Sequence, residues 1–513
     1  MAQQADSESE TTEIPRKTKP YSVVRRQLVI LGCFPLSEGV AWSTIFPYIY
    51  SMVKSLSAQE SSKDDIAIYA GLMVSVFTFG EFIGAPQWAK ISDRIGRKPT
   101  ILIGSIGAVF SALLFGFSTS IPMAIAARMC AGLLNPNLGV VTTFVGELVV
   151  SKDQEADGFS VVPTLRSLGT IIGPVIGGYL AEPVKNYPSL FHEGTVWDKF
   201  PYLLPNLAVV VFLLSSCTLG LFCLEEVHLK FRDQVNIKWT LTRRIQNIFK
   251  GKRWNADEAT YTPLREDEAD SGIPLRPIST AETPEEPEVK PPSAFTRQVK
   301  LQILSNAIQG FLKISTLAIV PVFLATPPEP GQPQNSTRGL EVIKGIFRIE
   351  GGFGLDTMDT SNVLLSQAIA TIGGQTLLVP AIIRRKGPLR SYRLVVVILI
   401  CLYCLLPFTA NWSTEAGIPT MLIILWIYTV ASSLATTCSQ ILIRNTVPSP
   451  IYLATVNGAA ASLGCLARTL GPAVSGPLFR LGLQTGYVGL PFWLLGVVTG
   501  LGGIVSLYLV NHA

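Results

Sequence analysis

Six ionisable side chains stand within stretches of the sequence that are otherwise apolar. A charge in the hydrocarbon layer of a membrane is unfavourable unless it lines a cavity or has a partner, and a carboxylate there takes up a proton more readily than in water. We therefore expect Glu38 to exchange between a proton and a salt bridge to Arg128 or Arg166, with Glu81 as the second proton carrier. The full set is Glu38, Glu81, Arg128, Arg166, Lys313 and Arg468.

Two simpler interpretations of these residues stay open. Glu38 could be a permanently paired structural charge, with no part in proton exchange. Arg128 lies near the start of its apolar stretch, so its long side chain could instead extend to the membrane surface.

The elements that must position these residues are membrane-spanning helices. Hydrophobic residues make up 48% of the 513 residues and charged residues only 15%, whereas a soluble domain carries about 25%. Much of the surface therefore faces lipid, which excludes a secreted domain, a nucleic-acid-binding module and a soluble enzyme. Twelve apolar stretches are long enough to span: 27–50, 66–88, 100–118, 121–146, 158–181, 201–224, 299–325, 361–383, 392–409, 418–442, 451–478 and 487–510.

These stretches predict an all-α membrane protein with two bundles of six helices. We expect a disordered cytosolic tail over 1–26, an N-terminal bundle over 27–226, a mostly disordered cytosolic central loop over 227–296 and a C-terminal bundle over 297–510. The first part of the loop, 229–253, is basic, whereas the second part, 254–293, is rich in acids and prolines and cannot bury enough apolar area to fold. Three landmarks recur in the same order in both halves, as is typical of transporters built from repeats.

The orientation follows from the lysines and arginines of the short loops. They gather in the N-terminal tail, in the loop near residue 95 and in the loop near residue 387, which places both termini in the cytosol. The two glycosylation sequons, at Asn335 and Asn411, then face the exterior or a lumen. We expect a plasma-membrane protein, with a vacuolar membrane as the alternative.

The loop after the second stretch carries a charged motif, Asp93-Arg94-Ile-Gly96-Arg97-Lys98. Gly96 permits a tight turn, and the charges can pair with helix ends. The motif resembles the G-x-L-x-D-R-x-G-R-K loop of the major facilitator superfamily, with Ala89 in place of the first glycine. The resemblance implies a conformational latch formed by these residues with Glu147 as the acidic partner. It also implies that Arg128, in R-x-x-x-G, takes part in proton transfer.

The fifth stretch gives the sharpest match. Its spacing resembles the antiporter signature S-x8-G-x3-G-P-x2-G-G of the zinc-induced facilitator-like branch, which includes fungal multidrug-type relatives. The match consists of Ser160, Gly169, Gly173, Pro174, Gly177 and Gly178. Small residues allow close helix packing, which at family level is linked to exchange of solutes. The resemblance extends over nearly all twelve stretches.

The ligand chemistry for zinc is weak in this sequence. Only His192, His228 and His512 are present, whereas zinc sites gather His, Cys or carboxylates, so we predict no metal site and no cofactor. No G-x-x-x-x-G-K-[S/T] loop is present either, and no catalytic cluster suggests an enzyme. Transport would therefore draw on an ion gradient.

We expect a proton-coupled efflux transporter for a small organic compound, such as a drug, toxin or secondary metabolite. Its partners would be that substrate, protons and the lipid bilayer, without nucleic acid, and it would act as a monomer. The predicted cavity residues are Tyr48, Asn135, Gln309, Lys313 and Trp426. A metal-ion or potassium exporter, and a transporter-like sensor that signals through the central loop, are the alternatives. The sequence names neither the substrate nor its direction or stoichiometry.

Overall fold

The structure is a computed structural model, and it describes residues 21–57, 65–149, 152–227, 295–328, 347–349, 351–412, 414–447 and 453–509. All the described helices belong to one compact unit. The predicted central loop lies outside the described residues except for Val227, Phe295 and Thr296, as do the predicted tail except for its last residues and the sequon at Asn335.

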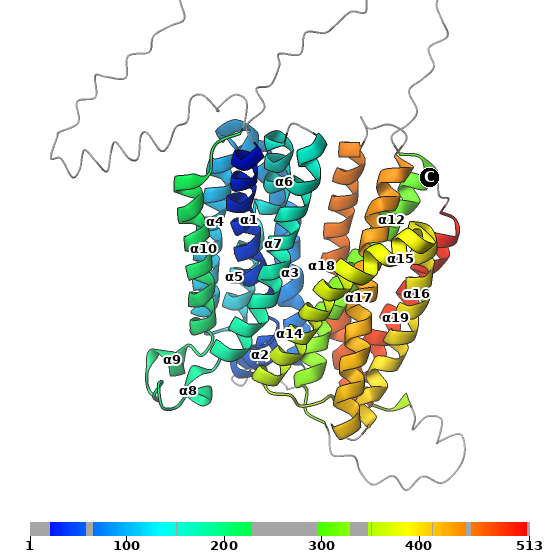
Figure 1. The fold of residues 1–513 in the computed structure, drawn as a ribbon. Coiled ribbons are helices and arrows are strands. Elements are labelled where there is room, and N and C mark those ends of the chain that lie inside the picture. Colours follow the sequence, from blue (N-terminus) through cyan, green and yellow to red (C-terminus); the bar gives the residue numbers. More distant parts are fainter. Residues whose placement is uncertain are drawn as a thin grey trace, which may run out of the picture. The chain divides into compact units, whose positions relative to one another are not determined.

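The N-terminal half (residues 21–227) contains six long rods, which Figure 1 shows running roughly alongside one another, and three short helices. One of the rods is broken into two helices, α5 and α6. In chain order the helices are α1 (Tyr21–Ser43), α2 (Ile49–Ser57), α3 (Ile66–Ile95), α4 (Arg97–Gly116), α5 (Ile121–Leu133), α6 (Asn137–Leu148), α7 (Lys152–Leu180), α8 (Pro183–Asn186), α9 (Val196–Lys199) and α10 (Leu203–Cys223).

The C-terminal half (residues 295–509) contains six further rods. Two of them change helical type along their length, through a π-helical turn η3 and a 3₁₀ turn η4. The elements are α12 (Arg297–Ala325), α14 (Thr357–Gly373), η3 (Gly374–Leu378), α15 (Val379–Lys386), α16 (Pro388–Leu405), η4 (Leu406–Asn411), α17 (Thr414–Thr446), α18 (Leu453–Thr485) and α19 (Leu490–Leu507).

The predicted fold class, twelve helical spans in an all-α protein, is confirmed. Within the described ranges, nine helical segments are long and apolar enough to cross a membrane. The fourth span is divided between the shorter helices α5 and α6, and α1 and α18 have the length but carry more polar residues. The first span differs from the prediction of 27–50: α1 ends at Ser43, and a turn leads into α2.

Two glycines reverse the chain at equivalent places in the halves. Gly96 ends α3 and begins α4 with φ 99°, and Gly387 ends α15 and begins α16 with φ 74°. Both φ values lie in the region that favours glycine. We call the end of the molecule that holds the Ile95–Arg97 turn, the start of α1 and the end of α10 the Gly96 end. The other end, with α2, α8 and α9, is the far end (Figure 1).

The apolar core shows how the halves meet. At the Gly96 end each half has its own cluster of buried residues, one around Leu28, Ile101 and Phe144 and the other around Ile303 and Ile443. A larger cluster contains residues of both halves; it includes far-end residues such as Ile49 and Phe323 and extends along the C-terminal half as far as Tyr392. Helix α3 packs on α18, and α7 packs on α14. The halves are thus joined at the far end.

Candidate functional site

Two carboxylates from different helices share one amide group inside the N-terminal half. Asn135 Nδ2 donates to Glu38 Oε1 of α1 at 2.8 Å and to Glu81 Oε1 of α3 at 2.9 Å. Glu38 is buried, with 8% of its surface exposed. The sequence named all three residues, but it placed Asn135 only as a cavity residue. The structure makes this asparagine the link between the two candidate proton carriers.

Asn135 reaches both carboxylates because its helix breaks there. Helix α5 ends at Leu133, Asn135 N–H donates to Gly132 O, and Pro136 interrupts the regular hydrogen bonding before α6 begins. Gly104 of α4 gives the ring of Pro136 its space, since a Cβ there would collide with the ring. Discontinuous helices of this kind place polar groups at the midplane of many transporters.

Glu38 pairs with Arg166 of α7 in this structure, and not with Arg128. Arg166 Nη1 lies 2.9 Å from Glu38 Oε2. The two atoms do not form an aligned hydrogen bond with each other, so charge holds the pair. In the described part of the chain, Glu81 has no cation within 4 Å and depends on Asn135 alone for a hydrogen bond.

Glycines on α7 set the register that brings Glu38 and Arg166 together. A Cβ at Gly169, Gly173 or Gly177 would collide with the backbone or side chain of α1. The α1 carbonyl groups that they meet, those of Leu36, Val40 and Thr44, are spaced four residues apart like the glycines themselves. Only glycine allows two helix backbones to approach this closely.

The remaining residues of the signature meet the other half of the molecule. The carbonyl of Pro174 accepts a hydrogen bond from Ser361 Oγ of α14 at 2.5 Å, and a Cβ at Gly178 would collide with the same serine. Ser160 lies in α7, where its side chain is outside the described part. One face of the motif thus packs on α1, while its far end packs on α14.

Arg128 is enclosed and does not extend to the surface. Its guanidinium lies 4.5 Å from the ring centre of Phe77 and 5.6 Å from that of Trp42, and its Nε donates to Met73 O at 3.4 Å. Cation–π contacts of this kind stabilise a desolvated arginine. The side chain borders a cavity of about 60 Å³, enough for a few water molecules.

Tyr48 also lines this cavity, together with Glu38 and Asn135. The Tyr48 ring stacks on Tyr202, and its hydroxyl accepts a hydrogen bond from Asn206 Nδ2 at 3.3 Å. The structure therefore brings two of the five predicted cavity residues to one cavity, and this cavity belongs to the N-terminal half.

The other predicted cavity residues lie in the C-terminal half and do not gather. Gln309 is buried and donates to the hydroxyl of Tyr392 at 3.1 Å. Trp426 is 41% exposed and donates to Ser366 Oγ at 3.0 Å. Lys313 is exposed and has no hydrogen bond or ion pair among the described residues; the nearby charges that act on it are those of Arg468 and Arg166.

The charged loop folds around Arg97. Its guanidinium donates to Glu147 at 2.8 Å from Nη2 and at 3.2 Å from Nε, to Asp93 at 2.5 Å and to Ser92 Oγ at 2.9 Å. Arg97 is buried, whereas Arg94 of the same motif points to the surface. Of the residues predicted as a latch, Asp93, Arg97 and Glu147 are thus joined by hydrogen bonds.

Sequence reasoning missed the carboxylate that completes this region. Glu226, just beyond α10, accepts the backbone N–H groups of Arg97 at 3.1 Å and Lys98 at 3.0 Å. A carboxylate at a helix N-terminus satisfies unpaired N–H groups and the helix dipole. Lys98 Nζ in turn donates to the carbonyls of Leu221 and Leu224. The position of Glu226 directly after an apolar span was the one feature of the sequence that could have indicated this role.

Sequence reasoning also missed two ion pairs that cross between the halves at the far end. Lys185 of α8 lies 3.1 Å from Asp356, and Asp65 lies 2.8 Å from Arg480 of α18. Partial burial alone would raise the pKa of Asp356, but the N–H of Thr357 and the charge of Lys185 hold it below its usual value. Partial burial would lower the pKa of Lys185, but Glu182 and Asp356 raise it.

The second sequon lies at the far end. Asn411 is exposed, and its Nδ2 donates to Arg348 O at 3.2 Å. Glycosylation of Asn335 and Asn411 stays a prediction. Within the described ranges no three His, Cys, Asp or Glu side chains gather in a way that could hold a metal ion.

Twelve helical spans in the described part of the chain, with the fourth broken and a polar network between helices, define the class of the protein: a multi-pass secondary transporter of membranes. A sequence profile of the Major Facilitator Superfamily matches residues 33–237. The major facilitator superfamily multidrug transporter mfsB of Aspergillus fumigatus is 35% identical over 511 residues, which cover 94% of this chain and 83% of that protein. The chain belongs to the major facilitator superfamily. It is a transporter and not an enzyme.

Two further comparisons agree. Protein ZINC INDUCED FACILITATOR-LIKE 1 of Arabidopsis thaliana is 37% identical over 186 residues, which cover 36% of this chain and 38% of that protein. The human organic anion transporter MFSD10 has the same fold, with a TM-score of 0.57 and 17% identity, covering 94% of this chain and 99% of that one. The predicted family and its branch are thus confirmed by the relatives.

Proposed function

We propose that the protein exports a small organic compound in exchange for protons, by alternating access of a central site to the two sides of a membrane. The Gly96 end and both termini face the cytosol, in the plasma membrane or, as the alternative, a vacuolar membrane. The relative in Aspergillus fumigatus, named as a multidrug transporter, supports an organic substrate. The protein acts as a monomer.

The shared amide of Asn135 is the observation that carries this proposal. Two carboxylates that accept from one side chain are close enough to influence each other's protonation. Glu38 has Arg166 as a counter-ion, whereas Glu81 has none within 4 Å among the described residues. Glu81 then takes the incoming proton, and Asn135 transmits the change of charge to the Glu38–Arg166 pair. Arg128 keeps the neighbouring cavity polar.

The joining of the halves supports alternating access. Contacts between α7 and α14 and between α3 and α18 hold the far end closed, which suits a state whose central site opens toward the Gly96 end. Asp93, Gly96, Arg97, Lys98 and Glu147 act as the latch that rearranges when the halves rock in the other direction. Tyr48, Asn135, Lys313 and Trp426 face the substrate path, and Gln309 supports it through Tyr392.

The test is efflux from cells that lack their own pumps. The cells express the wild type, Glu38→Gln, Glu81→Gln or Glu415→Gln, and accumulation of a panel of fluorescent organic compounds is measured with and without a protonophore. Glu415 is an exposed acid of α17 outside the network and serves as the matched control. Equal amounts of each variant at the membrane are verified on blots.

We expect lower accumulation of one class of compound with the wild type and with Glu415→Gln, abolished by the protonophore. Glu81→Gln should lose proton-driven efflux because its amide cannot carry the proton. Glu38→Gln should lose it because Arg166 is left without its counter-ion. Full proton-coupled efflux by Glu38→Gln would remove Glu38 from the mechanism. Efflux that the protonophore does not affect would overturn proton coupling.

A further inference from the structure

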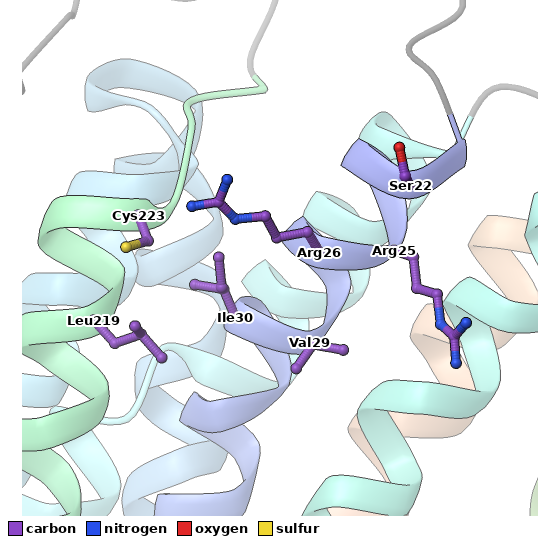
Figure 2. A pocket seen from close by; sticks show the side chains of 7 residues that line it. All are labelled: Ser22, Arg25, Arg26, Val29, Ile30, Leu219 and Cys223. Carbon is purple, nitrogen blue, oxygen red and sulfur yellow. The ribbon is translucent and has the colours of Figure 1, made fainter.

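A groove of about 560 Å³ lies at the Gly96 end of the N-terminal half, between α1 and α10. Figure 2 shows its lining: Arg26 extends from α1 toward Cys223 at the end of α10, Arg25 extends from the other side of α1, and Val29 and Ile30 lie one turn deeper. The proposed function uses none of these residues.

The two arginines have no partner among the described residues. In the described part of the chain neither Arg25 nor Arg26 makes a hydrogen bond or an ion pair, and both are exposed. Basic side chains often donate to the carbonyl groups at a helix C-terminus. At the C-terminus of α10 other side chains already bind these carbonyl groups. Gln27 donates to Cys223 O, and Lys98 donates to Leu221 O and Leu224 O. The positive charges are therefore available to a ligand.

The floor of the groove is apolar and faces outward. Val29 is 46% exposed and Leu219 is 39% exposed, which is unfavourable in water but natural against acyl chains. Neighbouring residues of α10, Val211, Leu214 and Phe222, are exposed in the same way. Helical rise places Ile30 about 6 Å below Arg26 along the helix axis. A ligand that matches the groove therefore has an anionic head and an apolar tail.

We propose that this groove binds an anionic glycerophospholipid. The phosphate and the charged head group lie against the guanidinium group of Arg26, and one acyl chain runs over Val29, Ile30 and Leu219. Arg25 adds positive charge from the other side of α1 (Figure 2). Basic pockets between helices recognise anionic lipids in this way. The binding itself depends only on the groove; that the lipid comes from the cytosolic leaflet rests on the orientation in the proposed function.

The test is native mass spectrometry of the purified full-length protein in detergent. The probes are phosphatidylserine and phosphatidylinositol, with phosphatidylcholine as the neutral lipid and glycerol phosphate as the head group without chains. The variants are Arg25→Gln/Arg26→Gln, Leu219→Trp, which fills the floor and keeps both charges, and Arg384→Gln/Arg385→Gln. The last pair is also adjacent, exposed and at the Gly96 end, but lies outside the groove. Thermal unfolding shows that each variant is folded.

We expect the wild type and the Arg384/Arg385 variant to prefer anionic lipid over phosphatidylcholine. Each arginine near anionic lipid contributes about fivefold in affinity, so the Arg25/Arg26 variant should lose about 25-fold. Leu219→Trp should lose the lipid although its charges remain, and glycerol phosphate should not compete. An equal loss in the Arg384/Arg385 variant, unchanged binding in Leu219→Trp, or full competition by glycerol phosphate would overturn the proposal. None of these outcomes depends on whether the protein exports a compound.

Discussion

At the far end of the molecule charged side chains join the two halves, whereas at the Gly96 end they act within one half. Lys185 and Asp356 lie on opposite sides of the division between the halves, as do Asp65 and Arg480. Arg97, by contrast, binds Asp93 and Glu147 of its own half. The far-end ion pairs therefore hold the two halves together. The ion pairs of Arg97 hold α3, α4 and α6 of the N-terminal half together.

The exposure of the two groups fits this division. The side chains of Lys185 and Asp356 are 61% and 49% exposed, whereas that of Arg97 is 9% exposed. Exposed ion pairs contribute little and break easily, which suits contacts that must open in each transport cycle. Removing one partner of a buried pair leaves an unpaired charge and is far more damaging. Variants at the two ends should therefore differ in what they change.

The largest effect is expected for Arg97→Ala. The variant leaves the carboxylate of Glu147 unpaired and removes hydrogen bonds to Asp93 and Ser92. It should lower the free energy of unfolding by about 2–3 kcal/mol, less than for a fully buried pair because Asp93 is exposed. Thermal unfolding in detergent measures this change.

Arg94→Ala is the matched control, because Arg94 belongs to the same motif and points to the surface. Its stability should stay within about 0.5 kcal/mol of the wild type. Equal unfolding temperatures for the Arg97 and Arg94 variants would contradict the structural role of the Gly96 end.

Glu226→Gln should have the next largest effect. The amide keeps one acceptor oxygen but loses the negative charge beside the N-terminus of α4, so stability should fall by about 1 kcal/mol. Glu193→Gln, an exposed acid of the far end, should change nothing. A Glu226 variant that unfolds like the wild type, measured by the same thermal assay, would show that the bonds to Arg97 and Lys98 are replaceable by water.

At the far end, Asp356→Asn and Asp65→Asn should shift the balance between conformations and hardly change stability. The exposed Lys185–Asp356 pair contributes about 0.2–1 kcal/mol, so Asp356→Asn should increase opening of the far end by up to about fivefold. The side chain of Asp65 is only 20% exposed, so Asp65→Asn should have the larger effect. The measurement is the labelling rate of a cysteine introduced at Ser361, which packs on Pro174 when the far end is closed. The two effects should multiply, since the pairs lie on different helices. If these two variants unfolded at a lower temperature and the cysteine at position 361 were not labelled faster, the far-end pairs would act on stability and not on conformation.

The smallest effect is a pH dependence of the same labelling rate. The pKa of Asp356 is lowered when the far end is closed, so the pair favours closure above the usual pKa of the carboxyl and loses this effect as the pH falls through the lowered value. The pKa of Lys185 is raised, so the pair is lost on the alkaline side only above the usual pKa of lysine. The rate is divided by that of an exposed reference cysteine at the same pH, because the reactive thiolate becomes scarcer in acid. This ratio should be constant near neutral pH and rise in acid. The Asp356→Asn variant should not show this rise in acid. If the variant still showed it, a titratable group other than Asp356 would be responsible.

The sequence was enough to predict the fold and to identify the polar residues inside it. It did not show which of these residues contact one another. Apolar length determines where a chain spans a membrane, so α12 at Arg297–Ala325 coincides closely with the stretch 299–325. Intramembrane charges are rare enough to identify Glu38, Glu81 and Arg166 as candidates. Which arginine pairs with Glu38 depends on the register of α1 against α7, which no local pattern reveals.

Contacts that join distant segments were the part that the sequence could not provide. Lys185 and Asp356 are separated by 171 positions and lie in exposed turns, where charged residues are ordinary. Glu226 is separated from Lys98 by 128 positions. The break at Pro136 could have been foreseen from proline alone, but the reach of Asn135 to two carboxylates required the positions of three helices.

The glycine spacing along α7 has a consequence for how a proton can move the protein. Because the backbones of α1 and α7 touch at Gly169, Gly173 and Gly177, the two helices cannot slide past each other and travel as one body through the cycle. Glu38 and Arg166 therefore keep the same separation of their backbones in every state, and their pair can open only by rotation of the side chains. Glu81 lies on α3, the helix that packs on α18 of the other half. In the mechanism that we propose, protonation of Glu81 therefore acts on the division between the halves, and the Glu38–Arg166 pair stays fixed while the halves move.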